Sequence, residues 1–250
     1  QSQQTATADI TKGEILVKAT AVATVYGEIP TFGASFSGFI TGEDESVISG
    51  EVTYVVGSSR SSAAAYTGKE HKGTYNIYPV VTGLSADNYT FSTEDGNLII
   101  AQRPVTVAAV DGALISKTYD GTTDVQPALV NGTHYEFAGV AGDAASGITN
   151  GDTVTLSYTA AYDEKDPLER TITANGLSLD NDDYKLETES FTIDGEITRK
   201  TIKVTANKKT ITYGDAAPTY TVSYSGFEHG ENESVLSGTL AFACDYDTSD

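Results

Sequence analysis

Three histidines are the first side chains in this sequence that could do chemistry, because histidine serves both as a general base and as a metal ligand. They are His71, His134 and His229. None has a second histidine or a cysteine at the spacing that a zinc site needs. No paired carboxylates can be placed across a cleft, as glycoside hydrolysis would require. We therefore interpret the histidines as solvated loop residues and expect a non-enzymatic protein without a cofactor.

The densest acidic run, residues 180–183, offers oxygen ligands of the kind that calcium prefers. Its candidate calcium ligands are Asp180, Asp182 and Asp183. The run lacks the alternating ligands, the central glycine and the distant glutamate of the EF-hand loop. An Asx-rich turn before a strand has the same composition without a metal. Both interpretations stay open.

Two further kinds of chemistry compete with structural roles. Glu43-Asp44-Glu45 and Glu231-Asn232-Glu233 could supply a general acid and base, but acid at the start of a short helical turn explains them better. A lysine–asparagine cross-link inside a domain would need Lys18 or Lys203 together with Asn97. The cross-link pattern does not recur along the chain, so we expect none.

The chain has 15 tyrosines and 8 phenylalanines, and aromatic faces can stack on sugars. Most of these residues occupy alternating positions of expected strands, where they would be core. Tyr135 and Tyr162 lie in polar, turn-rich surroundings, so we expect them to be the exposed ones. Binding of host glycan or mucin therefore stays open as an alternative function.

These residues belong to a chain that contains one pattern twice. A tyrosine–glycine pair, a Ser-Gly-Phe triplet and an acidic stretch between two glycines recur in the same order, at 26–27, 37–39 and 42–50 and again at 213–214, 225–227 and 230–238. The spacing agrees apart from one extra residue in the second copy. Chance does not produce this agreement, so we interpret the chain as an array of repeated domains.

The boundaries of the repeats follow from a strand pattern that occurs three times. Val17, Val107 and Val204 hold corresponding positions, 90 and 97 residues apart. We expect residues 1–12 to be the tail of a preceding repeat, 13–102 to be repeat one, 103–199 repeat two and 200–250 a truncated repeat three. Repeat three should then expose an unpaired sheet edge and part of its core, and residues 242–250 should be mobile or ordered only by a neighbouring molecule.

The pattern within each repeat is that of short strands bounded by turn residues, with one short helical turn. About seven strands in a domain of this size favour an all-β fold of tandem small β-sandwich domains, immunoglobulin-like in character. A β-grasp-like sheet packed on the short helix is the alternative. Gln102-Arg103-Pro104 and Thr198-Arg199-Lys200 join the repeats without glycine or serine. Such linkers predict a stiff connection.

Composition excludes several classes of partner. The 250 residues carry 35 acidic and 15 basic side chains, a net charge of −20, which opposes binding to nucleic acid or to an anionic membrane surface. Cys244 is the only cysteine, so no disulfide forms within the chain. No apolar run is long enough to span a membrane. We interpret the charge as a source of solubility and of repulsion between neighbours.

These motifs resemble two families of bacterial surface-protein repeats. Repeats one and three look like the MBG family, whose pattern in repeat one is Tyr26-Gly27, Pro30, Gly38-Phe39, Gly42-Glu43, Gly73-Thr74-Tyr75 and Asn88-Tyr89. Repeat two is similar to the YDG family through Tyr119-Asp120-Gly121, Gly151-Asp152 and Leu177. It departs from that family in having Glu164-Lys165-Asp166-Pro167 and in having Asp183 before Tyr184.

The resemblance implies a stalk or adhesin-like segment of a large bacterial protein that is secreted or attached to the cell wall. We therefore expect an extracellular location and a stiff spacer that projects a binding head. The expected partners are the neighbouring repeats of the same chain, and the resemblance carries over no catalytic residue.

Overall fold

The structure is a computed structural model that describes residues 7–243. Within this range the chain is nearly all β, with no α-helix. The chain divides into two compact units, and the division passes through repeat two. The first unit contains the chain up to Val107 with Phe137–Ser157 and Ser178–Thr188, and the second contains Ala108–Glu136, Tyr158–Leu177 and the chain from Glu189 onward.

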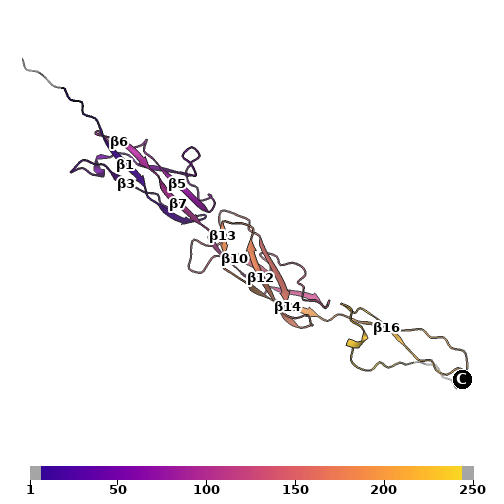
Figure 1. Cartoon of the computed structure of the whole chain (residues 1–250). Helices are drawn as coiled ribbons and strands as arrows, with labels where there is room; N and C mark the ends of the chain where they lie inside the picture. Colours follow the sequence, from indigo (N-terminus) through magenta and orange to yellow (C-terminus); the bar gives the residue numbers. More distant parts are fainter. Residues whose placement is uncertain (1–6, 244–250) are drawn as a thin grey trace, which may run out of the picture. The chain divides into compact units, whose positions relative to one another are not determined.

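Repeat one forms two sheets, drawn in indigo to magenta in Figure 1. One sheet has the order β3-β1-β6 and the other the order β2-β7-β5-β4. The first strand, β1, pairs antiparallel with β3 and parallel with β6, while β2 pairs parallel with β7. The strands are β1 (Gly13–Ala19), β2 (Val22–Val25), β3 (Ala34–Ser37), β4 (Thr53–Gly57), β5 (Gly73–Val80), β6 (Tyr89–Glu94) and β7 (Gly96–Ala101).

The core of repeat one follows from the two-residue alternation of its strands. Ile15 and Val17 of β1 are fully buried, and so are Leu98 of β7 and Ile77 of β5. Burial of each such side chain stabilises the fold by about 1.5–3 kcal/mol. The alternating pattern of the first strand of repeat one therefore predicts its buried face correctly.

The acidic stretches of repeats one and three begin single-turn 3-10 helices, η1 (Glu45–Val47) and η2 (Glu233–Val235). Asp44 caps η1 by accepting a hydrogen bond from the Ser46 backbone N–H at 2.9 Å. Hydrogen bonding to the side chain and the backbone of Ser46 lowers the pKa of Asp44. Asn232 makes the same contact in η2 at 3.0 Å. In both turns the side-chain oxygen of the N-cap residue satisfies a backbone N–H that has no partner within the helix. The described residues of repeat two contain no helical turn.

Repeat two has the same strand order as repeat one. Its sheet β10-β8-β13 corresponds to β3-β1-β6, and β11-β12-β14-β9 corresponds to β4-β5-β7-β2. This agreement confirms tandem β-sandwich domains, and no α-helix lies within residues 7–243 to form the alternative β-grasp. The strands are β8 (Arg103–Ala109), β9 (Leu114–Thr118), β10 (Tyr135–Ala138), β11 (Leu156–Tyr162), β12 (Glu169–Leu179), β13 (Tyr184–Leu186) and β14 (Phe191–Thr198).

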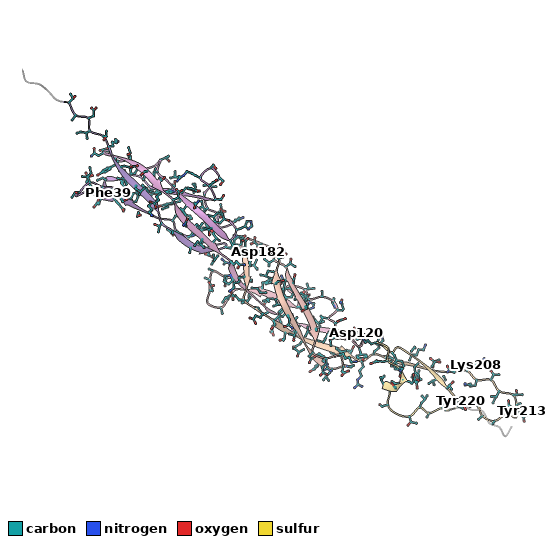
Figure 2. The ribbon with its side chains drawn as sticks, in the orientation of Figure 1. Phe39, Asp120, Asp182, Lys208, Tyr213 and Tyr220 are labelled. Carbon is teal, nitrogen blue, oxygen red and sulfur yellow. The ribbon has the colours of Figure 1, made fainter. Side chains whose placement is uncertain are left out.

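Repeat three has one two-stranded antiparallel sheet among its described residues, β15 (Lys203–Ala206) with β16 (Val222–Ser225). Val204 is 47% exposed, whereas its counterpart in repeat one is fully buried. Among the described residues, part of the core of repeat three is therefore exposed, as expected. Of the stretch expected to be mobile, residues 244–250 lie outside the described residues. Phe242 stacks on Tyr220, labelled in Figure 2, with ring centroids 5.6 Å apart.

The two tyrosines expected to be exposed are buried, so that prediction is wrong. Tyr135 is 5% exposed and Tyr162 is 3% exposed. The ring of Tyr135 packs on Phe191 at 5.9 Å, and the Tyr162 hydroxyl donates to the Ile115 carbonyl at 3.1 Å. Both residues lie at inward positions of strands, and their polar sequence neighbours occupy the outward positions.

Candidate functional site

The three histidines do not come together in the fold. The Nδ1 atom of His134 accepts a hydrogen bond from the Val130 backbone N–H at 2.9 Å, within its own loop. His229 lies beside Gly121, and His71 contacts Asp183. Among residues 7–243, no group of three or more His, Cys, Asp or Glu side chains is arranged to hold a metal ion.

The other candidates for acid–base or cross-linking chemistry make structural contacts. Lys18 Nζ lies 2.5 Å from Glu94 Oε1, and both side chains are about half exposed. Glu43 accepts a hydrogen bond from the hydroxyl of Tyr89, within the same repeat. These contacts account for the side chains without a reaction.

The three predicted calcium ligands point to different partners. Asp180 Oδ1 accepts a hydrogen bond from the Thr155 backbone N–H at 2.8 Å, which lowers the pKa of Asp180. The side chain of Asp182 is 96% exposed, 3.8 Å from Lys72 Nζ. Asp183 is buried and belongs to a contact between repeats. Calcium binding here stays a prediction.

One hydrophobic cluster runs from repeat one into repeat two. Within the first unit, Tyr26 and Ile100 of repeat one are buried together with Val105, Val154 and Tyr184 of repeat two. The rings of Tyr26 and Tyr184 meet edge to face, with centroids 5.6 Å apart and planes at 78°. Such a pair contributes about 0.5–1.5 kcal/mol beyond its burial. The linker between the two repeats therefore passes through a core.

Arg103 lies buried at this junction, with 6% of its surface exposed. Its guanidinium donates hydrogen bonds to the Gly147 carbonyl at 2.9 Å, the Ser146 carbonyl at 3.1 Å, the Tyr26 carbonyl at 3.2 Å and Glu28 Oε1 at 2.8 Å. A planar group with five N–H donors can satisfy such a set, whereas the point charge of a lysine cannot. Arg103 thus ties backbone of both repeats together.

A second polar contact joins the same two repeats. Asp183 of repeat two accepts the Lys72 backbone N–H at 2.7 Å, and its other carboxylate oxygen lies 2.5 Å from His71 Nδ1. This hydrogen bond, together with the charge of Asp183, raises the pKa of His71. The Asp183 side chain is 6% exposed and that of His71 is 82% exposed. The contact is strongest when the imidazole is protonated.

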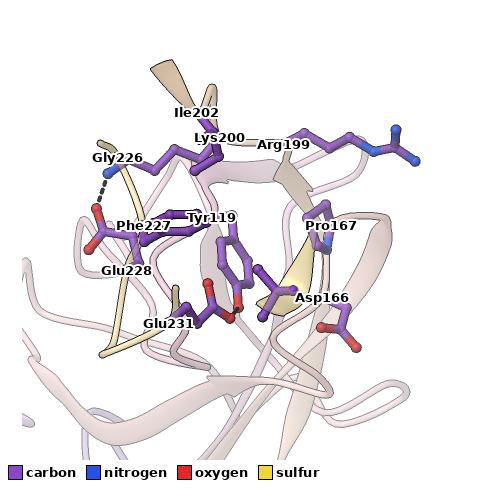
Figure 3. A pocket seen from close by; sticks show the side chains of 11 residues that line it. Tyr119, Asp166, Pro167, Arg199, Lys200, Ile202, Gly226, Phe227, Glu228 and Glu231 are labelled. Carbon is purple, nitrogen blue, oxygen red and sulfur yellow. Dashed lines mark hydrogen bonds and ion pairs between the residues drawn. The ribbon is translucent and has the colours of Figure 1, made fainter. Parts of the chain in front are cut away.

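The junction between repeats two and three lies within the second unit and surrounds a cavity of about 300 Å³ (Figure 3). Tyr119 donates a hydrogen bond to Glu231 Oε1 at 2.6 Å, and this contact raises the pKa of Tyr119 to about 12. Lys200 and Glu228, which form an ion pair, lie beside the cavity as well. Phe227 also lines the cavity. Aromatic side chains (Tyr119 and Phe227) and carboxylates (Glu228 and Glu231) therefore line the same cavity.

Both junctions use an element that we name the Tyr-Gly corner, formed by residues 26–27 in repeat one, 119–121 in repeat two and 213–214 in repeat three. The Tyr26 backbone N–H donates to the Ala101 carbonyl, and the Tyr119 N–H donates to the Thr198 carbonyl, both at 2.9 Å. Both acceptors are at the end of the closing strand of their repeat. The corner is therefore anchored beside the linker.

The second shared element is a turn that ends in an acidic residue, which we name the acid turn. In each repeat the acidic residue donates its backbone N–H to the carbonyl three residues earlier, at 3.0, 3.0 and 2.9 Å. Asn150 and His229, inside the second and third acid turns, have positive φ values of 57° and 53°. The acid turns are Ile40–Glu43, Thr149–Asp152 and Glu228–Glu231.

The Tyr-Gly corner docks on the acid turn of the next repeat at both junctions. A Cβ atom on Gly27 would lie 2.4 Å from Thr149 Cγ2, and one on Gly121 would lie 2.7 Å from His229 Cβ. Only glycine permits this approach. The Tyr119 hydroxyl donates directly to Glu231, the acidic residue of the turn on which its corner docks. Burial, together with hydrogen bonding to Asp152, raises the pKa of the corresponding Tyr26.

A family model describes the same parts of the chain. The model of the MBG domain (YGX type) matches residues 15–99 and 202–248, which together make up just over half of the chain. The chain belongs to the MBG domain family. Tyr26-Gly27 and Tyr213-Gly214 lie inside the matched stretches of this MBG chain. Membership indicates a structural repeat domain of the kind found in surface proteins, and the match does not include repeat two.

The remaining comparisons add little to the family. The MBG chain is similar to the I-band fragment I67-I69 from titin, with 12% identity over 83% of this chain and 85% of the fragment, and a TM-score of 0.23. A similarity at that level establishes neither a shared fold nor a shared function. No individual curated protein matches the chain. Within the described range, no helix combines the length and apolar character needed to cross a membrane.

Reasoning from the sequence missed the residues that form these junctions. The linker Gln102-Arg103-Pro104 predicts stiffness, but nothing in it indicates that Arg103 is buried. A signal was nonetheless present in the repeats themselves. The Tyr-Gly corner and the acid turn occur in every repeat. Two motifs that always occur together are candidates for contact between successive domains.

Proposed function

We propose that this MBG chain is a non-enzymatic stalk segment of a bacterial cell-surface, adhesin-like protein, in which the repeats act as a stiff spacer. The observation that carries the proposal is the hydrophobic cluster shared by repeats one and two, with Tyr26 and Tyr184 in edge-to-face contact. Domains joined by a sizeable apolar interface do not move independently, whereas domains joined by exposed linkers do. A spacer needs this kind of junction.

The polar contacts of the junctions support the same function. Arg103 is buried with its donors satisfied, and Asp183 is buried against His71 and Lys72. The net charge of −20 would keep neighbouring stalks apart on a crowded surface. We place the segment outside the cell, at the surface or cell wall. Its partners are the neighbouring repeats, without nucleic acid and without insertion of this segment into a membrane.

We propose in addition that repeat two is a repeat of the YDG type. Its Tyr119-Asp120-Gly121 signature forms an ordered turn in which Asp120 accepts hydrogen bonds from Lys117 Nζ and from the Thr122 backbone N–H, both at 2.9 Å. Burial opposes ionisation of Asp120, but these hydrogen bonds outweigh it and lower its pKa to about 2. The aspartate of the signature thus has a structural role in holding the corner.

Residual dipolar couplings measured on the whole chain test the spacer function. We expect couplings from β5 and β7 of repeat one and from β8 and β13 of repeat two to fit a single alignment tensor. Tyr26→Ala should split them into two tensors of different magnitude. Tyr213→Ala is the matched control, because its ring holds the corresponding position and is 84% exposed. Two independent tensors in the unaltered chain would rule out a stiff junction.

A further inference from the structure

Repeats one and two differ in the residues at the end where the first strand of each repeat begins. The Gly13 backbone N–H donates to the Asn88 carbonyl at 2.8 Å, and the Arg103 N–H donates to the Asp183 carbonyl at 2.8 Å. Gly13 and Asn88 of repeat one therefore correspond to Arg103 and Asp183 of repeat two. The two charged side chains that join repeat two to repeat one are replaced in repeat one by residues without a charge.

A third difference lies in the acid turn. The side chain of Asn150, inside the acid turn of repeat two, donates from Nδ2 to the Gly68 carbonyl of repeat one at 3.2 Å. The corresponding residue of repeat one is Thr41, whose side chain has no amide group. We name residues 103, 150 and 183 the leading face of repeat two, and residues 13, 41 and 88 the leading face of repeat one. Of these two faces, only that of repeat two carries the groups that bind the end of repeat one.

The residue that follows the Tyr-Gly corner differs in a matching way. Glu28 follows the corner of repeat one and pairs with Arg103 at 2.8 Å. Thr122 follows the corner of repeat two, which therefore has no carboxylate at this position. Repeat three has Lys200 at the position of Arg103, and Lys200 pairs with Glu228 of its own repeat. Carboxylate and arginine thus occur together at one junction, and hydroxyl and lysine at the other.

Burial makes this match selective. The Arg103 side chain is 7% exposed, so without Glu28 it would be a buried charge without a counterion. Conversely, a glycine in place of Arg103 would leave the Tyr26 carbonyl and the Glu28 carboxylate without their donor. The buried Asp183 likewise depends on the Lys72 backbone N–H that it accepts. Each end therefore favours its own partner and disfavours the other kind of repeat.

We propose that the junction between repeats one and two is selective, so that the end of repeat one accepts as its next domain a repeat with an arginine at the position of Arg103 and a carboxylate at the position of Asp183. A repeat with the leading face of repeat one does not meet this requirement, and the order of the two kinds of repeat is thereby encoded in their ends. The proposal rests on the proposed function, because it concerns what makes the junction of the spacer stiff.

A double-mutant cycle on the whole chain, measured by urea unfolding, tests the charged pair. Glu28→Thr, which installs the residue of repeat two, should raise the unfolding constant of the first unit about tenfold. In a chain that carries Arg103→Ala, the same substitution should change this constant by about twofold or less, because the partner is gone. Lys18 and Glu94 give the control cycle, since they pair within repeat one and are both about half exposed. That cycle should show a coupling of about threefold or less.

Exchange of the leading face tests the selection itself. The triple variant Arg103→Gly, Asn150→Thr and Asp183→Asn places the leading face of repeat one on repeat two. We expect residual dipolar couplings from repeats one and two of this chain to require two alignment tensors, where the unaltered chain requires one. Amide chemical shifts of the β11-β12-β14-β9 sheet show whether repeat two remains folded.

A control variant makes the same three changes of residue type at exposed positions of repeat two. It should keep a single alignment tensor, because none of the three residues belongs to the leading face. The control substitutions are Lys185→Gly, Asn175→Thr and Asp111→Asn.

Two outcomes would overturn the selective junction. One is a cycle for Glu28 and Arg103 with no more coupling than the control cycle, and the other is a folded, face-exchanged chain that keeps a single alignment tensor. If the exchanged repeat does not fold, the cycle decides alone. Neither outcome affects the spacer function, which fails only if the unaltered chain itself requires two tensors. A stiff chain without coupling would therefore retain the proposed function and lose this inference.

Discussion

At the scale of single residues, the junction between repeats one and two depends on the buried cation Arg103. Its donors are shared among carbonyls of both repeats and the Glu28 carboxylate. Arg103→Ala leaves three carbonyls and the Glu28 carboxylate, whose side chain is 45% exposed, without their donor, which costs about 1–3 kcal/mol. We expect a loss of that size in the free energy of unfolding of the first unit, measured with urea.

Arg60 provides the control for this substitution. It pairs with Asp95 at the surface, where about half of its side chain is exposed. Arg60→Ala should change the free energy of unfolding by about 1 kcal/mol or less. Arg103→Lys should recover only part of the loss, because a lysine cannot reach all the carbonyls. Equal effects of Arg103→Ala and Arg60→Ala would show that the buried guanidinium is not what holds the junction.

His71 makes the same junction sensitive to pH. Its hydrogen bond to Asp183 raises its pKa in the folded state above the ordinary value, with Lys72, Asp152 and Asp182 also facing the contact. The stabilisation is therefore complete below about pH 6.5 and is lost as the pH rises through the raised pKa. The effect will be small, since 82% of the His71 side chain is exposed and solvent screens the charge.

Thermal unfolding on either side of this pH window measures the effect. We expect the Tm of the first unit to fall between about pH 6 and about pH 8, and the fall to be absent in His71→Gln. His134→Gln is the control, because that ring bonds within its own loop. A pH dependence that survives in His71→Gln would assign it to other groups.

The calcium prediction can be tested at the same scale. Asp180 and Asp183 already accept hydrogen bonds from backbone N–H groups, and Asp182 points to solvent. We expect the Tm to be the same with calcium and with a chelator, because carboxylates held this way would have to give up their bonds to bind a metal. A Tm that rises with calcium and falls back in Asp182→Asn would establish the site instead.

At the scale of elements, the fit between corner and acid turn depends on glycine. Gly27 has a φ value of +86° and faces Thr149, while Gly112 has a φ value of +71° and faces nothing within 4 Å among the described residues. Alanine at either position strains the backbone by about 1–2 kcal/mol. Only Gly27→Ala also pushes the acid turn away, so urea unfolding should show a further loss of about 1–3 kcal/mol. Equal losses would mean that the close approach is not needed.

The sequence predicts the elements well because their signals are local. Alternation in β1 and β7 follows from a sheet with one buried face, and the acid before η1 follows from the capping of its free N–H groups. The burial of Tyr135 and Arg103 could not be predicted in the same way. A strand's sequence does not say which neighbour covers it, and a linker's sequence does not say that a second domain encloses it. Those facts depend on contacts between residues far apart in the chain.

The recurrence of motifs indicates contacts between successive repeats, which the local pattern of a single strand or linker cannot indicate. The Tyr-Gly corner and the acid turn have no obvious reason to occur together within one sandwich. Their partnership becomes clear only across the boundary between repeats, where Gly27 meets Thr149 and Gly121 meets His229. In a chain of repeats, a motif near the end of one domain is best compared with motifs near the start of the next.

At the scale of the whole molecule, net charge and aromatic exposure bear on the alternative function, binding of host glycan or mucin. The tyrosines expected to form a sugar platform, Tyr135 and Tyr162, are both buried. A net charge of −20 repels the acidic sugars that mucins carry. We therefore expect the whole chain to give no signal above background on a glycan and mucin array at physiological salt.

A missing signal on the array could come from charge repulsion as well as from the lack of a sugar site, so the array should be repeated at higher salt. Screening by higher salt removes long-range repulsion and leaves stacking on aromatic faces intact, so a true sugar site would gain signal as salt is raised. Tyr213→Ala is the variant to compare, because this ring is the most exposed tyrosine that the structure describes, at 84%. A signal on defined sugars that free sugar competes away, and that Tyr213→Ala removes, would make the repeats themselves the binding part of the protein. The same ring would then serve a ligand in place of a neighbouring repeat.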